Sequence, residues 1–338
     1  MRKLLVIALG LLLAAGAFAA AAQEVNVYSA RQEVLIKPLM DRFTAETGIR
    51  VNLVAGRADA LVQRLQSEGR NTRADVLLTV DAGNLNRAME LELFQPVQSE
   101  LLAQAVPAHL RDADGRWFAL SMRARPIVYA RDRVDPNEIT GYADLADERW
   151  RRRVCVRSSD NVYNQSLVAA MIATQGAEAA EQWVRGLVRN FARPPRGGDR
   201  DQIKAVAAGQ CDLTLVNTYY LAAMRADAAA DERAAAQRVG IIWPDQDGQG
   251  VHINVSGAGV TRHAPNRDNA QRLLEFLVSE EAQRWYAETN HEYPVRPGVP
   301  VSAALREFGD FKAEEVPLAT LGRYNAEAVR LMDRAGWR

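Results

Sequence analysis

Three tyrosines are the residues whose type and spacing most suggest chemistry. Tyr163 lies in Arg157-Ser-Ser-Asp-Asn-Val-Tyr-Asn164, and Tyr219 and Tyr220 lie in Asn217-Thr-Tyr-Tyr220. Both stretches follow short apolar segments that are predicted to be strands, and ligands of α/β sheets bind beyond the carboxyl ends of the strands. Clustered phenols can stack on an organic ligand in a cleft. As phenolates, they can instead ligate a hard metal ion, which prefers anionic oxygen.

Alternating strands and helices are needed to position these loops. The first half of the chain predicts three strands, Val25–Tyr28, Val51–Val54 and Val76–Val80, with helices between them. The first helix contains Pro38 and ends at Gly48, and the second has Asp59 as its N-cap and ends at Gly69. The second half repeats the order with strands Val154–Arg157, Leu213–Val216 and Gly240–Trp243, a helix over Tyr163–Thr174 and another from about Tyr219. This alternation predicts the α/β class.

Two extended stretches, 117–130 and 251–261, separate the repeats and are predicted to be paired crossover strands that form a hinge. The sequence thus predicts two α/β lobes. Lobe one comprises residues 24–124 plus 255–298, and lobe two comprises 130–250 plus 299–338.

Residues 1–22 have the pattern of a secretory signal peptide. A basic start at Arg2 and Lys3 precedes an apolar run from Leu4 to Phe18 and then small residues. A transmembrane anchor is the alternative, but the apolar run is short for one. We therefore expect an exported, soluble protein without direct membrane insertion.

Composition and motifs exclude several classes of function. Lys plus Arg number 42 and Asp plus Glu number 42, and this neutral balance argues against nucleic-acid binding. The sequence lacks the serine-hydrolase elbow, the zinc-protease motif and the P-loop, so an enzyme is not expected. Cys155 and Cys211 each precede a tyrosine of the candidate site by eight residues, at the start of strands that can be neighbours. An oxidising compartment favours a disulfide between them over two free thiols.

Six stretches resemble the ferric-iron solute-binding proteins of ABC importers, in order and over essentially the whole mature chain. They are Tyr28-Ser-Ala-Arg31, Leu78-Thr-Val-Asp-Ala-Gly83, Arg123-Ala-Arg125, Asn161-Val-Tyr-Asn-Gln-Ser166, Asn217-Thr-Tyr-Tyr220 and Asn290-His-Glu-Tyr-Pro-Val295. The tyrosine stretches are specific, whereas the others fit many solute-binding proteins. The resemblance implies a type II periplasmic-binding-protein fold whose two lobes close on Fe(III).

The resemblance also implies a ligand set, in which Tyr163, Tyr219 and Tyr220 bind the metal. Many relatives have His-Tyr directly after the arginine of the first loop, where this chain has Gln32 and Glu33. The contribution of lobe one is therefore open: Glu33 can ligate, Gln32 can support a ligand, or water and an anion can complete the coordination. Tyr28 and Asp81 are further candidates, with a helix cap as the alternative for Asp81.

An anion such as carbonate is expected beside the iron. Ser158, Ser159 and the helix N-terminus near Asp160 are candidates to hold it. Arg31 and Arg123 are candidates to pair with the anion or with the phenolates, and an interlobe salt bridge is the equal alternative for both arginines.

These expectations describe a monomeric periplasmic receptor that passes Fe(III) to an inner-membrane ABC permease. The alternative is a binding protein of the same fold for a polyamine, thiamine or an oxyanion. A polyamine binder needs several carboxylates in its cleft, and these loops offer mainly Asp81 and Glu33.

Overall fold

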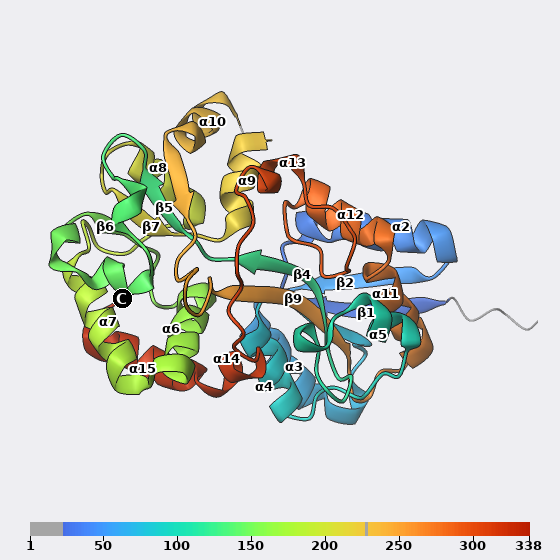
Figure 1. The fold of residues 1–338 in the computed structure, drawn as a ribbon. Coiled ribbons are helices and arrows are strands. Elements are labelled where there is room, and N and C mark those ends of the chain that lie inside the picture. The colour runs from blue at the N-terminus through green and yellow to red at the C-terminus, as the bar shows by residue number, and fades with distance from the viewer. Residues whose placement is uncertain (1–22, 227–228) are drawn as a thin grey trace, which may run out of the picture.

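The computed structural model describes residues 23–226 and 229–338, so the predicted signal peptide at 1–22 lies outside the described residues. Two β-sheets, each flanked by helices, form two lobes side by side (Figure 1). Within the described residues, no helix combines the length and the apolar character needed to cross a membrane.

The first sheet has the strand order β2-β1-β3-β9-β4. Its strands are β1 (Glu24–Ser29), β2 (Arg50–Ala55), β3 (Val76–Thr79), β4 (Phe118–Ala124) and β9 (Ile253–Val260). Strands β1, β2 and β3 are parallel, as the strand–helix alternation predicts, whereas β9 is antiparallel to β3 and β4. The helices of this lobe are α2 (Lys37–Thr47), α3 (Ala58–Glu68), α4 (Ala82–Glu90), α5 (Glu100–Ala105), α11 (Arg267–Leu277) and α12 (Glu280–Thr289).

The predicted helix ends are confirmed at three positions and wrong at one. Pro38 lies in the first turn of α2, Gly48 ends that helix with a φ of 71°, and Gly69 ends α3. Asp59 is not the N-cap of α3, because Arg57 is the N-cap and the helix begins at Ala58, two residues earlier than expected. Asp59 lies in the first turn, where a carboxylate also interacts favourably with the helix dipole.

The second sheet has the order β6-β7-β5-β8. Its strands are β5 (Ile127–Ala130), β6 (Val154–Cys155), β7 (Leu213–Leu215) and β8 (Val239–Ile242). Strands β6 and β7 are parallel neighbours, so their carboxyl ends share one edge. The predicted strand Val154–Arg157 is shorter than expected, since Arg157 has turned away to contact Asp199. Five helices surround this sheet: α6 (Val162–Gln175), α7 (Ala177–Arg189), α8 (Asp199–Ala207), α9 (Thr218–Ala226) and α10 (Ala230–Gln237).

The segments that connect the two sheets are shorter than the predicted crossover stretches 117–130 and 251–261. It leaves the first sheet after Ala124 and enters the second at Ile127, and it returns between β8 and β9. Strands β4 and β9 pair antiparallel beside the crossing, and the Arg125 amide donates to the His252 carbonyl at 3.0 Å. The extended stretches thus form a paired connection, while the lobe boundaries stay a prediction.

The C-terminal segment contacts both lobes. Helix α13 (Ala303–Arg306) packs on α9, and α15 (Asn325–Ala335) packs on α6 and α7. Between them, α14 (Ala319–Arg323) lies against both α4 and α6 (Figure 1). Gly322 permits this approach, because a Cβ there would lie 2.8 Å from the Cβ of Asn86.

A buried carboxylate joins the two lobes directly. Asp81 caps α4 by accepting from the Gly83 amide at 2.7 Å. Its other oxygen accepts from Ser166 of α6 at 2.8 Å and from Asn254 of β9 at 2.7 Å. Burial raises the pKa of Asp81, although these hydrogen bonds oppose the shift.

Helix α6 is a buried element of the second lobe. Six consecutive residues, 167–172, are buried because α7, α14 and α15 cover the helix from several sides. Such a helix needs apolar residues around its circumference rather than along one stripe. It therefore gives its first turn, which carries Tyr163, a fixed position.

Cys155 of β6 and Cys211, just before β7, form a disulfide with their Cα atoms 5.8 Å apart. Both cysteines are buried, and the bond links segments 56 residues apart in sequence. Since β6 and β7 are neighbours and carry the tyrosine loops, the disulfide joins the bases of both loops.

Replacing both cysteines with alanine should lower the free energy of unfolding. The chain-entropy description gives about 4 kcal/mol as an upper value for a loop of this length, and measured losses are commonly smaller. Urea denaturation of the parent and of the Cys155→Ala, Cys211→Ala double variant measures the difference. Thiol titration of the unfolded, non-reduced parent should find no free thiol, and finding two would contradict the pairing.

Candidate metal centre

The three candidate tyrosines start two helices that follow neighbouring strands. Tyr163 is the second residue of α6, which follows β6, and Tyr219 and Tyr220 are the second and third residues of α9, which follows β7. Because β6 and β7 are parallel, both helices begin at the same edge of the sheet. The Asn161 side chain caps α6 by accepting from the Tyr163 amide at 3.2 Å.

The phenol groups converge in space although their loops are more than fifty residues apart. The Tyr163 and Tyr219 hydroxyl oxygens lie 3.2 Å apart. The rings of Tyr219 and Tyr220 are tilted by 33° with their centroids 4.2 Å apart. All three side chains are half-buried, so the cluster is partly accessible to solvent.

This clustering makes the phenols hard to ionise. Burial, together with the neighbouring phenols Tyr163 and Tyr220, raises the pKa of Tyr219 well above its ordinary value of 10. Burial, Tyr163 and Asp199 raise the pKa of Tyr220 to about 12. Burial and the neighbouring phenols disfavour the phenolate form, so Tyr219 and Tyr220 are neutral at pH 7 unless a cation is present.

Two arginines place positive charge beside Tyr163. The guanidinium carbons of Arg157 and Arg125 lie 5.7 and 5.9 Å from the centre of its ring. Arg157 donates to Asp199 at 2.9 Å, and Arg125 approaches the same carboxylate at 3.5 Å. Asp199 is fully buried and also accepts from the Asn217 amide at 2.7 Å. One carboxylate therefore orients both arginines and the loop that carries two of the tyrosines.

Amide side chains from both tyrosine loops also accept hydrogen bonds from Arg125. Its guanidinium donates to Asn164 at 2.6 Å and to Asn217 at 3.0 Å. Burial lowers the pKa of Arg125, and Asp199 opposes that effect. Arg125, Asp199 and Arg157 were not predicted as site residues from the sequence. Signals for Arg125 were present, because it lies two positions after Arg123. Its partners Asn164 and Asn217 belong to the two tyrosine motifs.

Arg31 and Arg123 share one carboxylate within the first lobe, so the expected interlobe salt bridge is wrong, while their pairing with an anion or with the phenolates stays a prediction. Both pair with the buried carboxylate of Glu292, and both donate to the Ser256 hydroxyl. Burial favours a neutral Glu292, but the two arginines outweigh it and hold the pKa of that carboxyl below its ordinary value. Glu292 is near β4, since its neighbour Tyr293 bonds to Met122, so the salt bridge lies inside one lobe rather than between lobes.

The structure uses Tyr28 and Asp81 elsewhere. The Tyr28 hydroxyl donates to Glu68 at 2.8 Å, and the ring lies 4.7 Å from the guanidinium carbon of Arg64. Asp81 caps α4 and bonds to Ser166, as described above. The hydrogen bonds of both side chains go to residues other than the three tyrosines, and a ligand role for either stays a prediction.

The remaining sequence candidates have side chains that are open to a ligand. Gln32 and Glu33 are exposed at the start of a 3-10 turn over Glu33–Leu35. Ser158 and Ser159 are half-buried in the loop before α6, and the Ser158 hydroxyl accepts from the Asp160 amide at 3.3 Å. The helix N-terminus lies near Asp160 as predicted, with Asn161 at the cap and α6 beginning at Val162.

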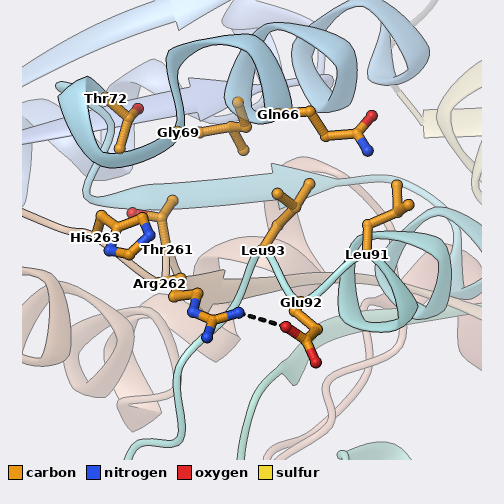
Figure 2. A pocket seen from close by; sticks show the side chains of 10 residues that line it. Gln66, Gly69, Thr72, Leu91, Glu92, Leu93, Thr261, Arg262 and His263 are labelled. Atoms are coloured by element: carbon orange, nitrogen blue, oxygen red, sulfur yellow. Dashed lines mark hydrogen bonds and ion pairs between the residues drawn. The ribbon is translucent and has the colours of Figure 1, made fainter.

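Other parts of the described chain offer no comparable centre. Residues 23–226 and 229–338 contain no group of three or more His, Cys, Asp or Glu that could hold a metal ion. Figure 2 shows a pocket on the first lobe between α3 and the segment after α4, where Arg262 pairs with Glu92. A narrow crevice, too small for a water molecule, lies beside Tyr163 and is lined by Arg123, Arg125, Asn217, His252 and Asn254. The tyrosine cluster thus adjoins the crossing between the lobes.

Comparison with known proteins gives consistent matches over nearly the whole chain. Residues 71–308 match the family described as bacterial extracellular solute-binding protein. Iron uptake protein A1 of Synechocystis is 49% identical over 316 residues, covering 94% of this chain and 88% of the relative.

Solved structures match the fold as well as the sequence. A Trichodesmium protein in complex with iron and citrate ligands is 47% identical, with a TM-score of 0.88 over 93% of this chain and 100% of that one. The ferric binding protein from Campylobacter jejuni is 37% identical, with a TM-score of 0.89 over the same shares of the two chains. The predicted type II periplasmic-binding-protein fold with two α/β lobes is confirmed by these neighbours. The chain therefore belongs to the bacterial extracellular solute-binding proteins, in the group that includes the ferric-iron-binding proteins.

Proposed function

We propose that this protein is a periplasmic receptor that captures Fe(III) through the phenolates of Tyr163, Tyr219 and Tyr220 and delivers it to an ABC importer. The observation that carries the proposal is the convergence of three phenol groups from two helices, with hydroxyl oxygens as close as 3.2 Å. Relatives named for iron uptake and ferric binding support iron as the cargo.

Charge balance favours a trivalent ion. Fe(III) is a hard acid that prefers anionic oxygen, and three phenolates neutralise its charge. A divalent ion would leave one excess negative charge among the three phenolates. Arg125 and Arg157 carry one positive charge more than Asp199 neutralises, and with Fe(III) that surplus is left for an anion beside the metal.

Three oxygens leave coordination positions for other ligands. Ser158 and Ser159 lie in the loop that carries Tyr163, and we propose that they help to hold an anion such as carbonate there. Gln32 and Glu33 are the candidates from the first lobe, because their side chains are exposed. The relative solved with iron and citrate supports an anion beside the metal.

A receptor is favoured over the alternatives. The relatives are named as uptake and binding proteins rather than as enzymes. A polyamine would need carboxylates free to accept its ammonium groups. Asp199 is held by two arginines, and Asp81 by Ser166 and Asn254. Of the candidate carboxylates this leaves Glu33 alone, whereas a polyamine needs several.

Replacing any one of the three tyrosines with phenylalanine should lower iron affinity and weaken or shift the phenolate-to-Fe(III) charge-transfer band. The substitution removes only the ligand oxygen, so packing is nearly unchanged. Visible absorption during titration with a ferric chelate of known stability measures both effects. Tyr324→Phe is the matched control, since Tyr324 is half-buried at the start of α15, and it should leave the band unchanged.

Parent-like iron binding by all three variants would reject the tyrosine site. A colourless parent protein that binds another solute instead would favour the alternative of a different ligand in the same fold.

Iron binding should release protons. Because the pKa of Tyr219 is raised well above 10 and that of Tyr220 to about 12, both phenols are protonated at neutral pH and must lose a proton to bind. Affinity therefore rises with pH below these values, with a slope of about three in log K per pH unit if all three tyrosines ionise. Each Tyr→Phe variant should lower the slope by about one. The amount of base needed to hold the pH constant while iron is added to a weakly buffered solution measures the number of protons released. A slope of zero in log K against pH would exclude phenolate ligands.

The lobes should close on iron, since the tyrosines belong to one lobe and Gln32 and Glu33 to the other. Hinge closure around ligands is common in binding proteins of this architecture. Small-angle X-ray scattering should give a smaller radius of gyration with iron than without it. Superimposable profiles would show that the cleft is closed before iron arrives.

A further inference from the structure

A second cluster of positive charge lies on the second lobe, away from the tyrosine hydroxyls. A surface pocket of about 730 Å³ is bordered by the loop after α7 and by α8. Its charged lining consists of Arg193, Arg196 and Lys204, with Asp201 as the one acidic residue among the lining residues. The pocket therefore carries a surplus of positive charge in a protein whose overall charge is zero.

The two arginines have no carboxylate partner. Arg193 is half-buried and donates to the neutral amides of Gln210 at 3.0 Å and Gln202 at 3.2 Å, while its Nε atom has no partner. Arg196 is exposed. Neither guanidinium forms an ion pair within residues 23–226 and 229–338, unlike Arg133, Arg153 and Arg157, which each pair with an aspartate.

The nearby acidic groups are committed to other partners. The Asp201 carboxylate accepts from the Gly198 amide at 2.7 Å as part of the start of α8. Glu232 pairs with Lys204 and with Arg200. Burial and the neighbouring Arg196 lower the pKa of Arg193, and Asp201 only partly offsets this. The repulsion between the two guanidiniums is thus left uncompensated by the protein.

We propose that this pocket binds a multivalent oxyanion, such as phosphate or sulfate, between Arg193 and Arg196, with Lys204 at its edge. Guanidinium groups form charge-assisted and often bidentate hydrogen bonds to such anions. The anion relieves the repulsion that the protein itself does not offset. The site needs no iron, and no tyrosine is among the residues that line the pocket. It lies on the same helix as Asp199, which begins α8 and holds Arg157.

Calorimetric titration of inorganic phosphate into the iron-free protein tests the proposal, at constant ionic strength because salt screens exposed charges. Saturable one-to-one binding is expected. Arg193→Gln and Arg196→Gln should each weaken it about tenfold or more, since each removes a charged donor. Arg189→Gln is the matched control, because Arg189 is exposed on α7 outside the pocket, and it should bind like the parent.

Two further variants keep the outcome decisive. Arg196→Glu reverses an exposed charge without disturbing the interior, so it should abolish binding while the unfolding curve stays unchanged. Tyr220→Phe should bind phosphate like the parent, which separates this pocket from the proposed metal site. Absence of saturable binding by the parent, or parent-like affinity in Arg196→Glu, would overturn the proposal.

Discussion

The mutual repulsion of three phenolates in a half-buried site is the constraint on which the proposed function depends. Tyr163, Tyr219 and Tyr220 are close enough that burial and their neighbours raise the phenol pKa values of Tyr219 and Tyr220. The cluster is therefore stable as neutral phenols and becomes anionic only when a strongly charged cation compensates it. Such a site selects metal ions by their charge, because a trivalent ion stabilises each phenolate that forms more strongly than a divalent ion does.

The second lobe is organised to hold this cluster in place before metal arrives. Parallel strands β6 and β7 present both tyrosine loops at one edge, and the disulfide joins the bases of the loops. Burial of α6 fixes the position of Tyr163, and Asp199 fixes Arg157 together with the loop before Tyr219. In the first lobe, Glu292 pairs with both Arg31 and Arg123, and the side chains of Gln32 and Glu33 are exposed.

Local patterns predicted the order of the strands and helices and the motifs that carry the tyrosines, because periodicity and helix ends depend on neighbouring residues. Partners distant in sequence were not predictable in this way. Asp199 is 42 residues from Arg157, and Glu292 is 261 residues from Arg31, so no spacing indicated these pairs. Without Glu292, Arg31 looked free to bind an anion. Without Glu68, Tyr28 looked like a ligand, whereas a side chain on α3 takes up its hydroxyl.

The central claim is that Fe(III) is bound by three tyrosine oxygens of one lobe. The most direct test is a crystal structure of the iron-loaded protein with anomalous diffraction data collected on both sides of the iron absorption edge. The account predicts one strong iron peak within bonding distance of the hydroxyl oxygens of Tyr163, Tyr219 and Tyr220. An iron peak bonded to other residues, or no iron peak at the tyrosines in protein shown to carry iron, would contradict it.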